Sequence, residues 1–288
     1  MRSFKDKVVA ITGAGSGIGR ALAGAFAAEG SRLALSDRDQ SGLQATIDGL
    51  GGSAGGQAIH KALVDVADRD AIYAWAAEVE ATFGAVHVVV NNAGVALGAS
   101  VEGASDADLH WLMDINFWGV VHGTRAFLPA LRRAGEGHVV NISSLFGLIA
   151  VPTQSAYCAS KAAVKGFTEA LRMELELEGC GVSATVVHPG SIRTEIARRA
   201  RSTDAGVAAI MGSDIGRNQR DFDKRLVMPP PQAAAIILGA VRRDARRVLV
   251  GMDAVAVATL QRLAPSGYQS AVIRQVRADR ARRAARAQ

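Results

Sequence analysis

The chain has 288 residues, of which 49% are hydrophobic and 21% charged, and it carries a formal net charge of +6. This length suits one large α/β domain, and because no linker-like change in composition occurs, we expect residues 1–288 to form a single domain. The two cysteines, Cys158 and Cys180, exclude a disulfide framework, show no metal-ligand spacing and suit a reducing cytoplasm. The apolar run Val8–Ile11 is too short for a signal peptide, and no run reaches the roughly 18 residues of a membrane span. We therefore expect a cytoplasmic protein with no metal and no membrane span.

Short apolar runs alternate with longer amphipathic runs along most of the chain. The short runs predict buried strands at Val8–Thr12, Leu33–Ser36, Val86–Val90, Val139–Ser143, Ala184–His188 and Val248–Val250. The longer runs predict helices at Ile18–Glu29, Gln40–Leu50, Asp68–Phe83, Ser105–Arg133, Ser155–Glu178 and Gln232–Arg242. Strands that are hydrophobic on both faces are typical of a covered parallel sheet. The sequence therefore predicts a doubly wound, Rossmann-type α/β fold with a parallel sheet of about seven strands and helices on both faces.

Two segments depart from this alternation. The segment Ile192–Met228 has scattered charges and glycines and no strand pattern, which is typical of an inserted, mobile substrate loop. Its arginines could select an anionic substrate, although a solvated loop face is favoured: Arg198, Arg199, Arg201, Arg217, Arg220 and Arg225. Residues 252–288 predict a C-terminal helical extension whose arginines, from Arg274 to Arg286, are interpreted as a solvated face and not as a nucleic-acid site.

A glycine-rich run, Thr12–Gly19, lies between the first predicted strand and the first predicted helix. Glycines there let the backbone turn tightly and approach a diphosphate, whose charge is favoured at a helix N-terminus. A simple tight turn is the competing interpretation, but a strand before and a helix after it favour a nucleotide site. The candidate cofactor-binding residues in this run are Gly13, Ser16, Gly17, Ile18 and Gly19.

Asp37 ends the second predicted strand, about 20 residues beyond the glycines. An acidic side chain at this point accepts hydrogen bonds from ribose hydroxyls and repels a 2′-phosphate. Arg38 could instead pair with that phosphate. We therefore predict NAD as the cofactor, with NADP as the alternative.

Ser144, Tyr157 and Lys161 form the candidate catalytic group. Ser144 follows a predicted strand, at the edge where an open α/β sheet holds its ligands. Tyr157 and Lys161 are four residues apart on a predicted helix, so their side chains leave the same face. An ammonium near a phenol favours the phenolate, and we expect Lys161 to lower the pKa of Tyr157 from about 10 toward working pH. Such a pair also arises by chance on amphipathic helices, so the neighbouring motifs decide its meaning.

In combination and in this order, the motifs resemble the short-chain dehydrogenase/reductase family, in its compact single-domain branch, over roughly residues 5–194. The matching motifs are T-G-x-x-x-G-x-G at Thr12–Gly19, N-N-A-G at Asn91–Gly94, Y-x-x-x-K at Tyr157–Lys161 and a P-G segment at Pro189–Thr194, and Asn116 and Ser144 fit the family's asparagine and serine. The resemblance implies further cofactor contacts: Asp65 and Val66 at the adenine, Asn91 and Gly94 on the adenosine side, Ile192 and Thr194 at the nicotinamide, with Asn92, Ala93, Pro189 and Gly190 beside them.

The resemblance also implies hydride transfer between a nicotinamide cofactor and a secondary alcohol or ketone. In that scheme Tyr157 is the general acid/base and Ser144 holds the substrate oxygen. Lys161 holds the ribose hydroxyls, and Asn116 anchors a water that relays the proton. The alternatives are an NADPH-dependent carbonyl reductase, a catalytically silent nucleotide-binding regulator, and an epimerase or dehydratase of the extended branch.

The remaining expectations concern assembly and two side chains near the site. The helices around Trp111–Leu131 and Ala162–Leu175 carry apolar residues on more than one side, and together with the resemblance this predicts a homodimer or homotetramer. His188 and Cys158 are interpreted as structural residues.

Overall fold

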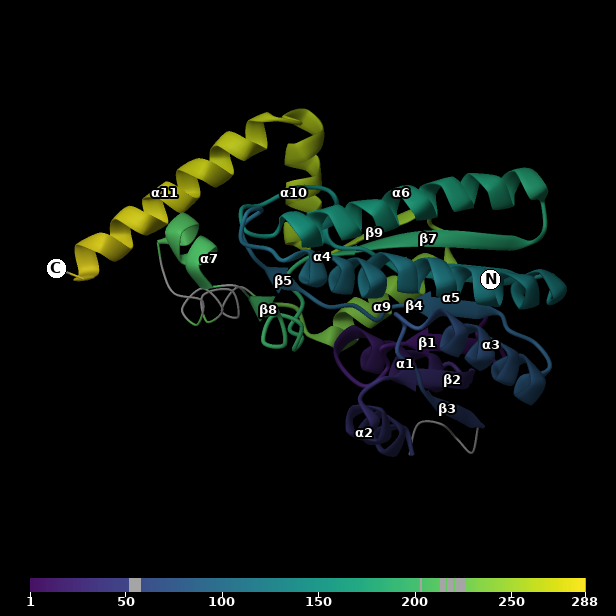
Figure 1. The fold of residues 1–288 in the computed structure, drawn as a ribbon. Coiled ribbons are helices and arrows are strands. Elements are labelled where there is room, and N and C mark those ends of the chain that lie inside the picture. The colour runs from purple at the N-terminus through teal and green to yellow at the C-terminus, as the bar shows by residue number, and fades with distance from the viewer. Residues whose placement is uncertain (52–57, 203, 213–215, 217–219, 221–225, 288) are drawn as a thin grey trace.

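A computed structural model describes residues 1–51, 58–202, 204–212, 216, 220 and 226–287. Seven strands form one parallel sheet in the order β3-β2-β1-β4-β6-β7-β9 (Figure 1). Their bounds are β1 Val8–Thr12, β2 Arg32–Asp37, β3 Ile59–Leu63, β4 Val88–Asn91, β6 Gly137–Ile142, β7 Val182–Pro189 and β9 Arg247–Val250. The strand order reverses between β1 and β4, which opens a crevice at the carboxyl ends of these two strands. The predicted doubly wound fold is confirmed.

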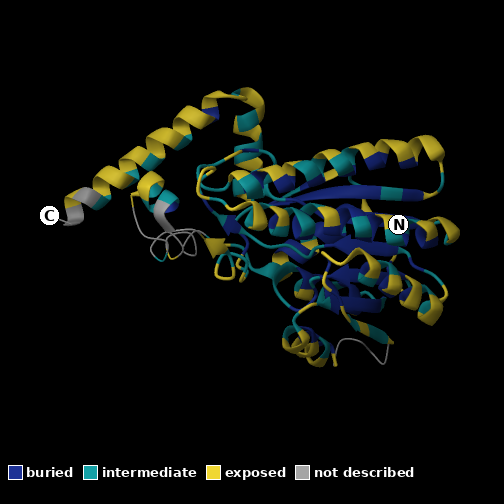
Figure 2. Cartoon of the chain, in the orientation of Figure 1, coloured by how far each residue is buried: buried dark blue, intermediate teal, exposed yellow. Residues whose placement is uncertain are grey.

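Helices cover both faces of the sheet, and the sheet between them is buried (Figure 2). The helices are α1 Gly17–Ala28, α2 Gln40–Leu50, α3 Arg69–Phe83, α4 Asp106–Met113, α5 Gly119–Arg133, α6 Ser155–Glu178, α7 Asp204–Met211, α9 Pro230–Arg242, α10 Met252–Leu263 and α11 Gly267–Ala287. One buried cluster joins α1 and α9 to one face, and another joins α3, α5 and α6 to the other. Each face of the sheet therefore has its own hydrophobic core, as expected for strands without a polar face.

Local sequence explains where several helices begin and end. The carboxylates of Asp39 and Asp68 accept hydrogen bonds from the first backbone N–H groups of α2 and α3, and Ser105 does the same for α4. Gly84 and Gly179 end α3 and α6 in the left-handed conformation, which glycine adopts without strain. The caps at Asp39 and Asp68 follow β2 and β3 at the carboxyl edge of the sheet, whereas Gly84 and Gly179 precede β4 and β7 at the opposite edge.

Three details differ from the sequence prediction. β3 was not predicted, because it is an edge strand with His60 and Lys61 within it and only one strand neighbour. The single helix predicted at Ser105–Arg133 is divided by a π-helical turn, Asp114–Trp118, between α4 and α5. The loop predicted between Ile192 and Met228 contains α7 and a short strand, β8 Arg201–Ser202, which pairs with β5 Leu97–Gly98. Arg217 and Arg225 lie outside the described residues.

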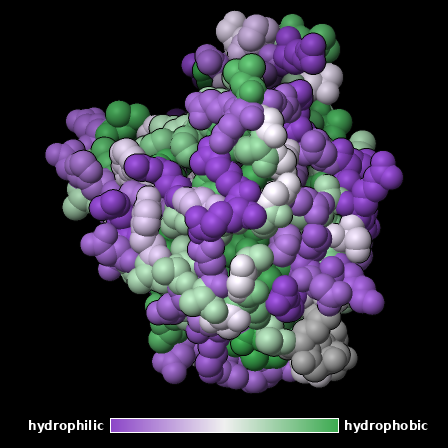
Figure 3. Space-filling view, turned by 90° about the vertical axis from the view of Figure 1, so that its right-hand side faces the viewer, coloured by the Kyte–Doolittle hydropathy of each residue, from purple (hydrophilic) through white to green (hydrophobic). Residues whose placement is uncertain are grey.

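The two ends of the sheet differ in character. At the amino ends of the strands, ion pairs join Lys7 to Glu136 at 2.8 Å and Arg133 to Glu80 at 2.6 Å. That side of the molecule intersperses hydrophilic and hydrophobic side chains (Figure 3). Beyond the carboxyl ends, α10 leads into α11, which runs away from the sheet beside α7 (Figure 1). None of the helices in the described part of the chain is both long and apolar enough to cross a membrane.

Candidate functional site

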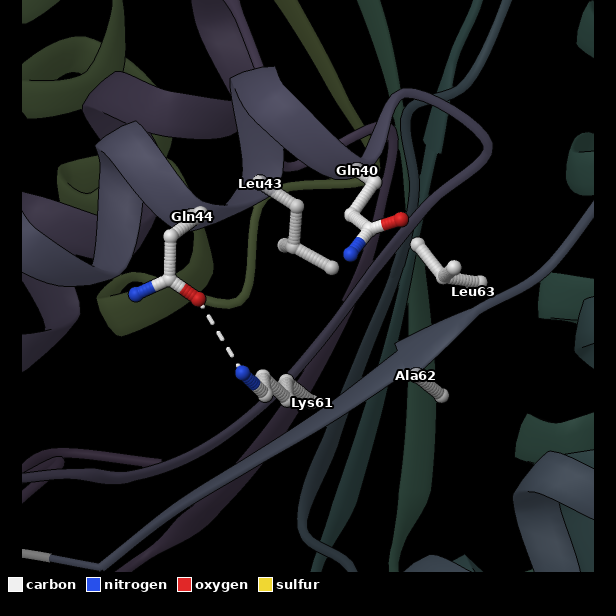
Figure 4. A pocket seen from close by; sticks show the side chains of 6 residues that line it. All are labelled: Gln40, Leu43, Gln44, Lys61, Ala62 and Leu63. Atoms are coloured by element: carbon white, nitrogen blue, oxygen red, sulfur yellow. Dashed lines mark hydrogen bonds between the residues drawn. The ribbon is translucent and has the colours of Figure 1, made fainter.

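The main cavity lies at the carboxyl ends of the strands, across the crevice between β1 and β4. Its volume is about 880 Å³, and its walls include residues from the loops after β1, β2, β3, β4, β6 and β7. A second hollow, between α2 and β3, has a volume of about 160 Å³ and is lined by Gln40, Leu43, Gln44, Lys61, Ala62 and Leu63 (Figure 4). This hollow contains none of the predicted site residues, and the Gln44–Lys61 hydrogen bond of 3.0 Å crosses it. The larger cavity is therefore the candidate site.

The glycine-rich turn after β1 has no room for larger residues. Gly13 has a φ of +65°, and a Cβ on it would lie 2.8 Å from the Cα of Ala93. A Cβ on Gly19 would collide with the carbonyl oxygen of Gly13. The Asn92 side chain donates to the carbonyl oxygens of Thr12 and Gly13 at 3.0 and 3.1 Å, which holds the turn against the loop after β4. The turn thus presents backbone N–H groups of the α1 N-terminus to the cavity, a favourable place for a diphosphate.

Asp37 contacts the glycine-rich turn at Gly15, whereas Asn92 contacts it at Thr12 and Gly13. Its two carboxylate oxygens accept hydrogen bonds from the backbone N–H groups of Gly15 at 2.8 Å and Asp39 at 2.9 Å. A Cβ on Gly15 would lie 2.8 Å from this carboxylate, so the turn and the acidic side chain are in direct contact. Arg38 is exposed at the cavity rim. The fixed negative charge of Asp37 favours a ribose hydroxyl over a phosphate.

Most of the other predicted cofactor contacts also line the cavity: Ser16, Gly17, Ile18, Asp65, Val66, Ala93, Gly94, Pro189, Gly190, Ile192 and Thr194. Two of the predicted cofactor contacts do not line it. Gly19 lies behind Gly13, where it permits the tight turn. Asn91 is buried in the sheet and donates to Thr124 and Asn141 at 3.0 and 2.8 Å, so its side chain packs within the fold.

Ser144 and Tyr157 meet in the wall between the nucleotide end and the rest of the cavity. Burial raises the pKa of Tyr157 to about 12, and a hydrogen bond with the Ser144 hydroxyl acts in the opposite direction. Lys161 lies one helical turn from Tyr157, with its Nζ 5.9 Å from the centre of the phenol ring. Its Nζ donates to the carbonyl oxygen of Ile142 at 3.1 Å, and burial lowers its pKa to about 8.

The expectation that Lys161 lowers the pKa of Tyr157 is therefore wrong for the protein's own groups. Both side chains are buried, and removing a charged form from water raises the pKa of a phenol and lowers that of an amine. Among the protein groups that shift the pKa of Tyr157, Ser144 is the one that lowers it. Ser144 is thus placed to influence the proton affinity of the phenol as well as to contact a ligand.

Asn116 is fully buried in the π-helical turn and does not line the cavity. Its Oδ1 accepts from the Val95 N–H at 2.8 Å, and its Nδ2 donates to the Val95 carbonyl at 3.0 Å and to Ser160 at 3.1 Å. Both amide hydrogens are thus engaged within the protein. The side chain anchors the loop after β4 to α6.

Several residues that sequence patterns did not identify support the site. The Thr12 hydroxyl accepts from the N–H groups of Asn92 and Ala93 at 3.0 and 3.1 Å, and the Asp253 carboxylate accepts from the Ser191 N–H at 2.7 Å. Asp253 and Tyr268 come from the C-terminal extension, so no local motif marks them. Thr12 lies inside the glycine motif, where its own role was overlooked.

His188 is also a support, as predicted. Its Nδ1 lies 2.9 Å from the Ser144 carbonyl oxygen, which can only accept, so this nitrogen carries the hydrogen. Burial lowers the pKa of His188 to about 4, so the imidazole is neutral at working pH. It fixes the backbone of the residue that contacts Tyr157.

The arginines of the segment after β7 are partly engaged. Arg201 lies 3.8 Å above the Trp111 ring and pairs with Asp108 at 3.1 Å, and Arg199 pairs with Asp39 at 3.5 Å. Both line the cavity. These pairs agree with the interpretation of a solvated loop face more than with a dedicated anion site.

Comparison with known proteins gives a consistent set of relatives. The family described as short chain dehydrogenase matches residues 7–205. SadH of Mycobacterium tuberculosis is 48% identical over 273 residues, covering 94% of this chain and 96% of its own. The solved structure of a short chain dehydrogenase/reductase from Burkholderia phymatum in complex with NAD is 30% identical, with a TM-score of 0.84 over 93% of this chain and 97% of its own. An alcohol dehydrogenase from Thermococcus sibiricus, complexed with 5-hydroxy-NADP, is 25% identical, with a TM-score of 0.70 over 85% of this chain and 96% of its own.

Proposed function

This chain belongs to the short-chain dehydrogenase family, and on that premise we propose that it interconverts a secondary alcohol and a ketone, with Tyr157 as the general acid/base. The observation that carries the proposal is the contact between Tyr157 and Ser144 inside the cavity that also contains the glycine-rich turn. A proton-transfer group and a nucleotide-binding turn that open into one cavity are what hydride transfer coupled to proton transfer requires.

The residues present fit a nicotinamide dinucleotide. The cradle at Gly13 and Gly19 is closed to any side chain, which suits close approach of a diphosphate to the backbone. Asp37 suits the ribose of NAD, and Ile192 and Thr194 line the same cavity. When bound, the dinucleotide supplies the hydride acceptor or donor.

In the proposed reaction the protein manages one proton. Ser144 holds the substrate oxygen beside Tyr157, and the phenol oxygen takes the hydroxyl proton during oxidation or returns it during reduction. The buried setting of Tyr157 keeps the phenol protonated, which by itself suits reduction. For oxidation, the hydrogen bond with Ser144 has to favour the phenolate.

NAD is the proposed cofactor, since the fixed carboxylate of Asp37 opposes a 2′-phosphate. The alternative is an NADPH-dependent carbonyl reductase, supported by exposed Arg38 at the cavity rim and by the relative complexed with 5-hydroxy-NADP. A silent nucleotide-binding regulator is less favoured, because Ser144, Tyr157 and Lys161 are all present in one cavity.

Tyr157→Phe tests the proposal. Removal of one positioned proton-transfer group lowers rates by about 10² to 10⁴, so turnover of any alcohol or ketone substrate should fall by that factor. Tyr157 is also among the predicted cofactor contacts, but NAD should still raise the melting temperature of the variant, because the glycine-rich turn and Asp37 are unchanged. A variant with near-normal turnover would reject Tyr157 as the proton-transfer group.

The proposal includes a cytoplasmic homodimer or homotetramer. Free thiols at Cys158 and Cys180 are compatible with a reducing compartment. Exposed Trp118, Met173 and Leu177, with 46%, 56% and 89% of their surface accessible, lie on the helices expected to pack between subunits. Sedimentation equilibrium measures this directly, and a monomer at micromolar concentration would exclude it.

A further inference from the structure

The cavity continues past Tyr157 into a region walled by the C-terminal extension. Three segments distant in sequence contribute to it: α7, α10 and α11. The apolar side chains on these helices that line it are Val207, Met211, Val257, Leu260, Val272 and Val276. None of them belongs to the nucleotide end or to the catalytic group.

The α11 side of this region carries an apolar stripe, and Gln275, Asp279 and Arg283 line the cavity beside and beyond it. Tyr268, Val272 and Val276 follow at intervals of four residues, so they lie on one face of the helix. Eight residues of α-helix span about 12 Å at 1.5 Å per residue. The next residue after Val272, Ile273, faces outward and is 45% exposed. Tyr268, Val272 and Val276 thus face the cavity, whereas Ile273 on the same helix does not line it.

Hydrogen bonds hold these walls in place. The Tyr268 hydroxyl accepts from the Ala150 N–H at 3.1 Å, which fixes the start of α11 to the loop that follows Ser144. Further along α11, Arg280 and Arg283 donate to the carbonyl oxygens of Ile210 and Met211 at 3.4 and 3.1 Å. α7 therefore lies against α11, as Figure 1 shows, and Val207 and Met211 of α7 line the same space as the apolar stripe of α11.

We propose that this space binds an extended aliphatic chain on the carbon that bears the reacting oxygen, so that the substrate is a secondary alcohol or ketone with a long hydrocarbon tail. The inference rests on the proposed function for the reacting end. The inference about the tail rests on the apolar wall of the cavity alone. Each methylene that this wall removes from water should raise the affinity on the order of three- to fourfold. Short alcohols would leave the apolar stripe in contact with water.

A homologous series of methyl ketones, from butan-2-one to decan-2-one, tests the inference. Affinity is measured by calorimetry and kcat/KM by the reduced-nicotinamide absorbance. We expect both to rise on the order of three- to fourfold per added methylene until the chain has passed the stripe. A flat series, with turnover present, would overturn the inference and leave the proposed chemistry standing. A rising affinity without turnover would uphold the inference and reject the chemistry.

Matched substitutions on α11 locate the tail. Val276→Trp should lower the ratio of kcat/KM for decan-2-one to that for butan-2-one at least tenfold, and Val272→Trp should do so at a shorter chain length. Ile273→Trp, on the outward face of the same helix, should leave the series unchanged. Equal effects of Val276→Trp and Ile273→Trp would place the tail elsewhere and overturn the inference. Val272→Trp serves in its place if Val276→Trp does not fold, as judged by thermal unfolding.

Discussion

Replacing Ser144 by alanine removes the one protein group that lowers the pKa of Tyr157. Burial pushes that pKa to about 12, so the phenolate depends on every contact that favours it. A hydrogen bond to a charged group contributes about 1.5 to 3 kcal/mol. At about 1.4 kcal/mol per pKa unit, its loss raises the pKa of Tyr157 by about one to two units.

The sign follows from which form of Tyr157 each direction needs. Alcohol oxidation needs the phenolate, so its rate rises with pH through the pKa of Tyr157, and Ser144→Ala moves that limb upward by about one to two pH units. Below the limb, kcat/KM for oxidation should fall about 10- to 100-fold. Ketone reduction needs the protonated phenol, so its falling limb moves in the same direction.

Initial rates of nicotinamide reduction across the pH range provide the assay. Ser144→Thr keeps a hydroxyl and should retain most of the wild-type profile. Ser144 also accepts from the Phe146 N–H at 3.1 Å, so thermal unfolding of both variants checks that this turn survives. If Ser144→Ala lowers kcat/KM for ketone reduction at neutral pH as much as it lowers kcat/KM for alcohol oxidation, Ser144 only positions the substrate, and the reasoning about the phenol is refuted.

Three further substitutions test the nucleotide end and the fold. Asp37→Ser should reduce the preference for NAD over NADP at least about fivefold, because a like charge at about 4 Å costs about 1 to 4 kcal/mol between water and a surface dielectric; unchanged ratios of kcat/KM would contradict it. Gly19→Ala should weaken NAD binding at least tenfold in calorimetry, because its methyl group meets the carbonyl oxygen of Gly13, and wild-type affinity would show that the turn adapts. Asp244→Ala should lower the free energy of unfolding by about 1 to 2 kcal/mol at neutral pH, since half-exposed Asp244 pairs with buried Arg172 at 2.8 Å. Burial raises the pKa of Asp244, but the pairing with Arg172 outweighs burial and the pKa is lowered. The difference in unfolding free energy between wild type and variant should therefore decline as pH falls below about 4 and vanish once the folded protein is protonated at Asp244. A difference that persists in acid would point to packing instead.

The parts of the fold and site that the sequence predicted are those set by local spacing. The glycine-rich turn and the four-residue interval between Tyr157 and Lys161 are fixed by neighbours along the chain, so a strand before them and a helix around them suffice to place them. β3 was missed because its one-sided edge position permits polar residues such as Lys61.

The parts that sequence could not predict depend on distant contacts or on burial. Asp253 and Tyr268 reach the site from helices that come more than 100 residues after Ser144 along the chain. The pKa of Tyr157 follows from the surrounding protein and not from the charge of its nearest lysine. Spacing alone cannot report how much water a side chain has lost.

The π-helical turn at Asp114–Trp118 sets the rotational phase of α5 relative to α4. In this turn the Gly119 N–H reaches the Asp114 carbonyl, five residues back, so the turn accommodates one residue more than an α-helix would. If the same residues were wound as a regular α-helix, every residue after this turn would be rotated by about 100° about the helix axis. Gly119 of α5 lies too close to Val66, and Gly123 too close to Asn91, for either glycine to carry a Cβ. After such a rotation, both glycines would point away from these neighbours. The wide turn is thus what directs both glycines toward the sheet, and the same residues wound as an unbroken α-helix would separate this helix from β4.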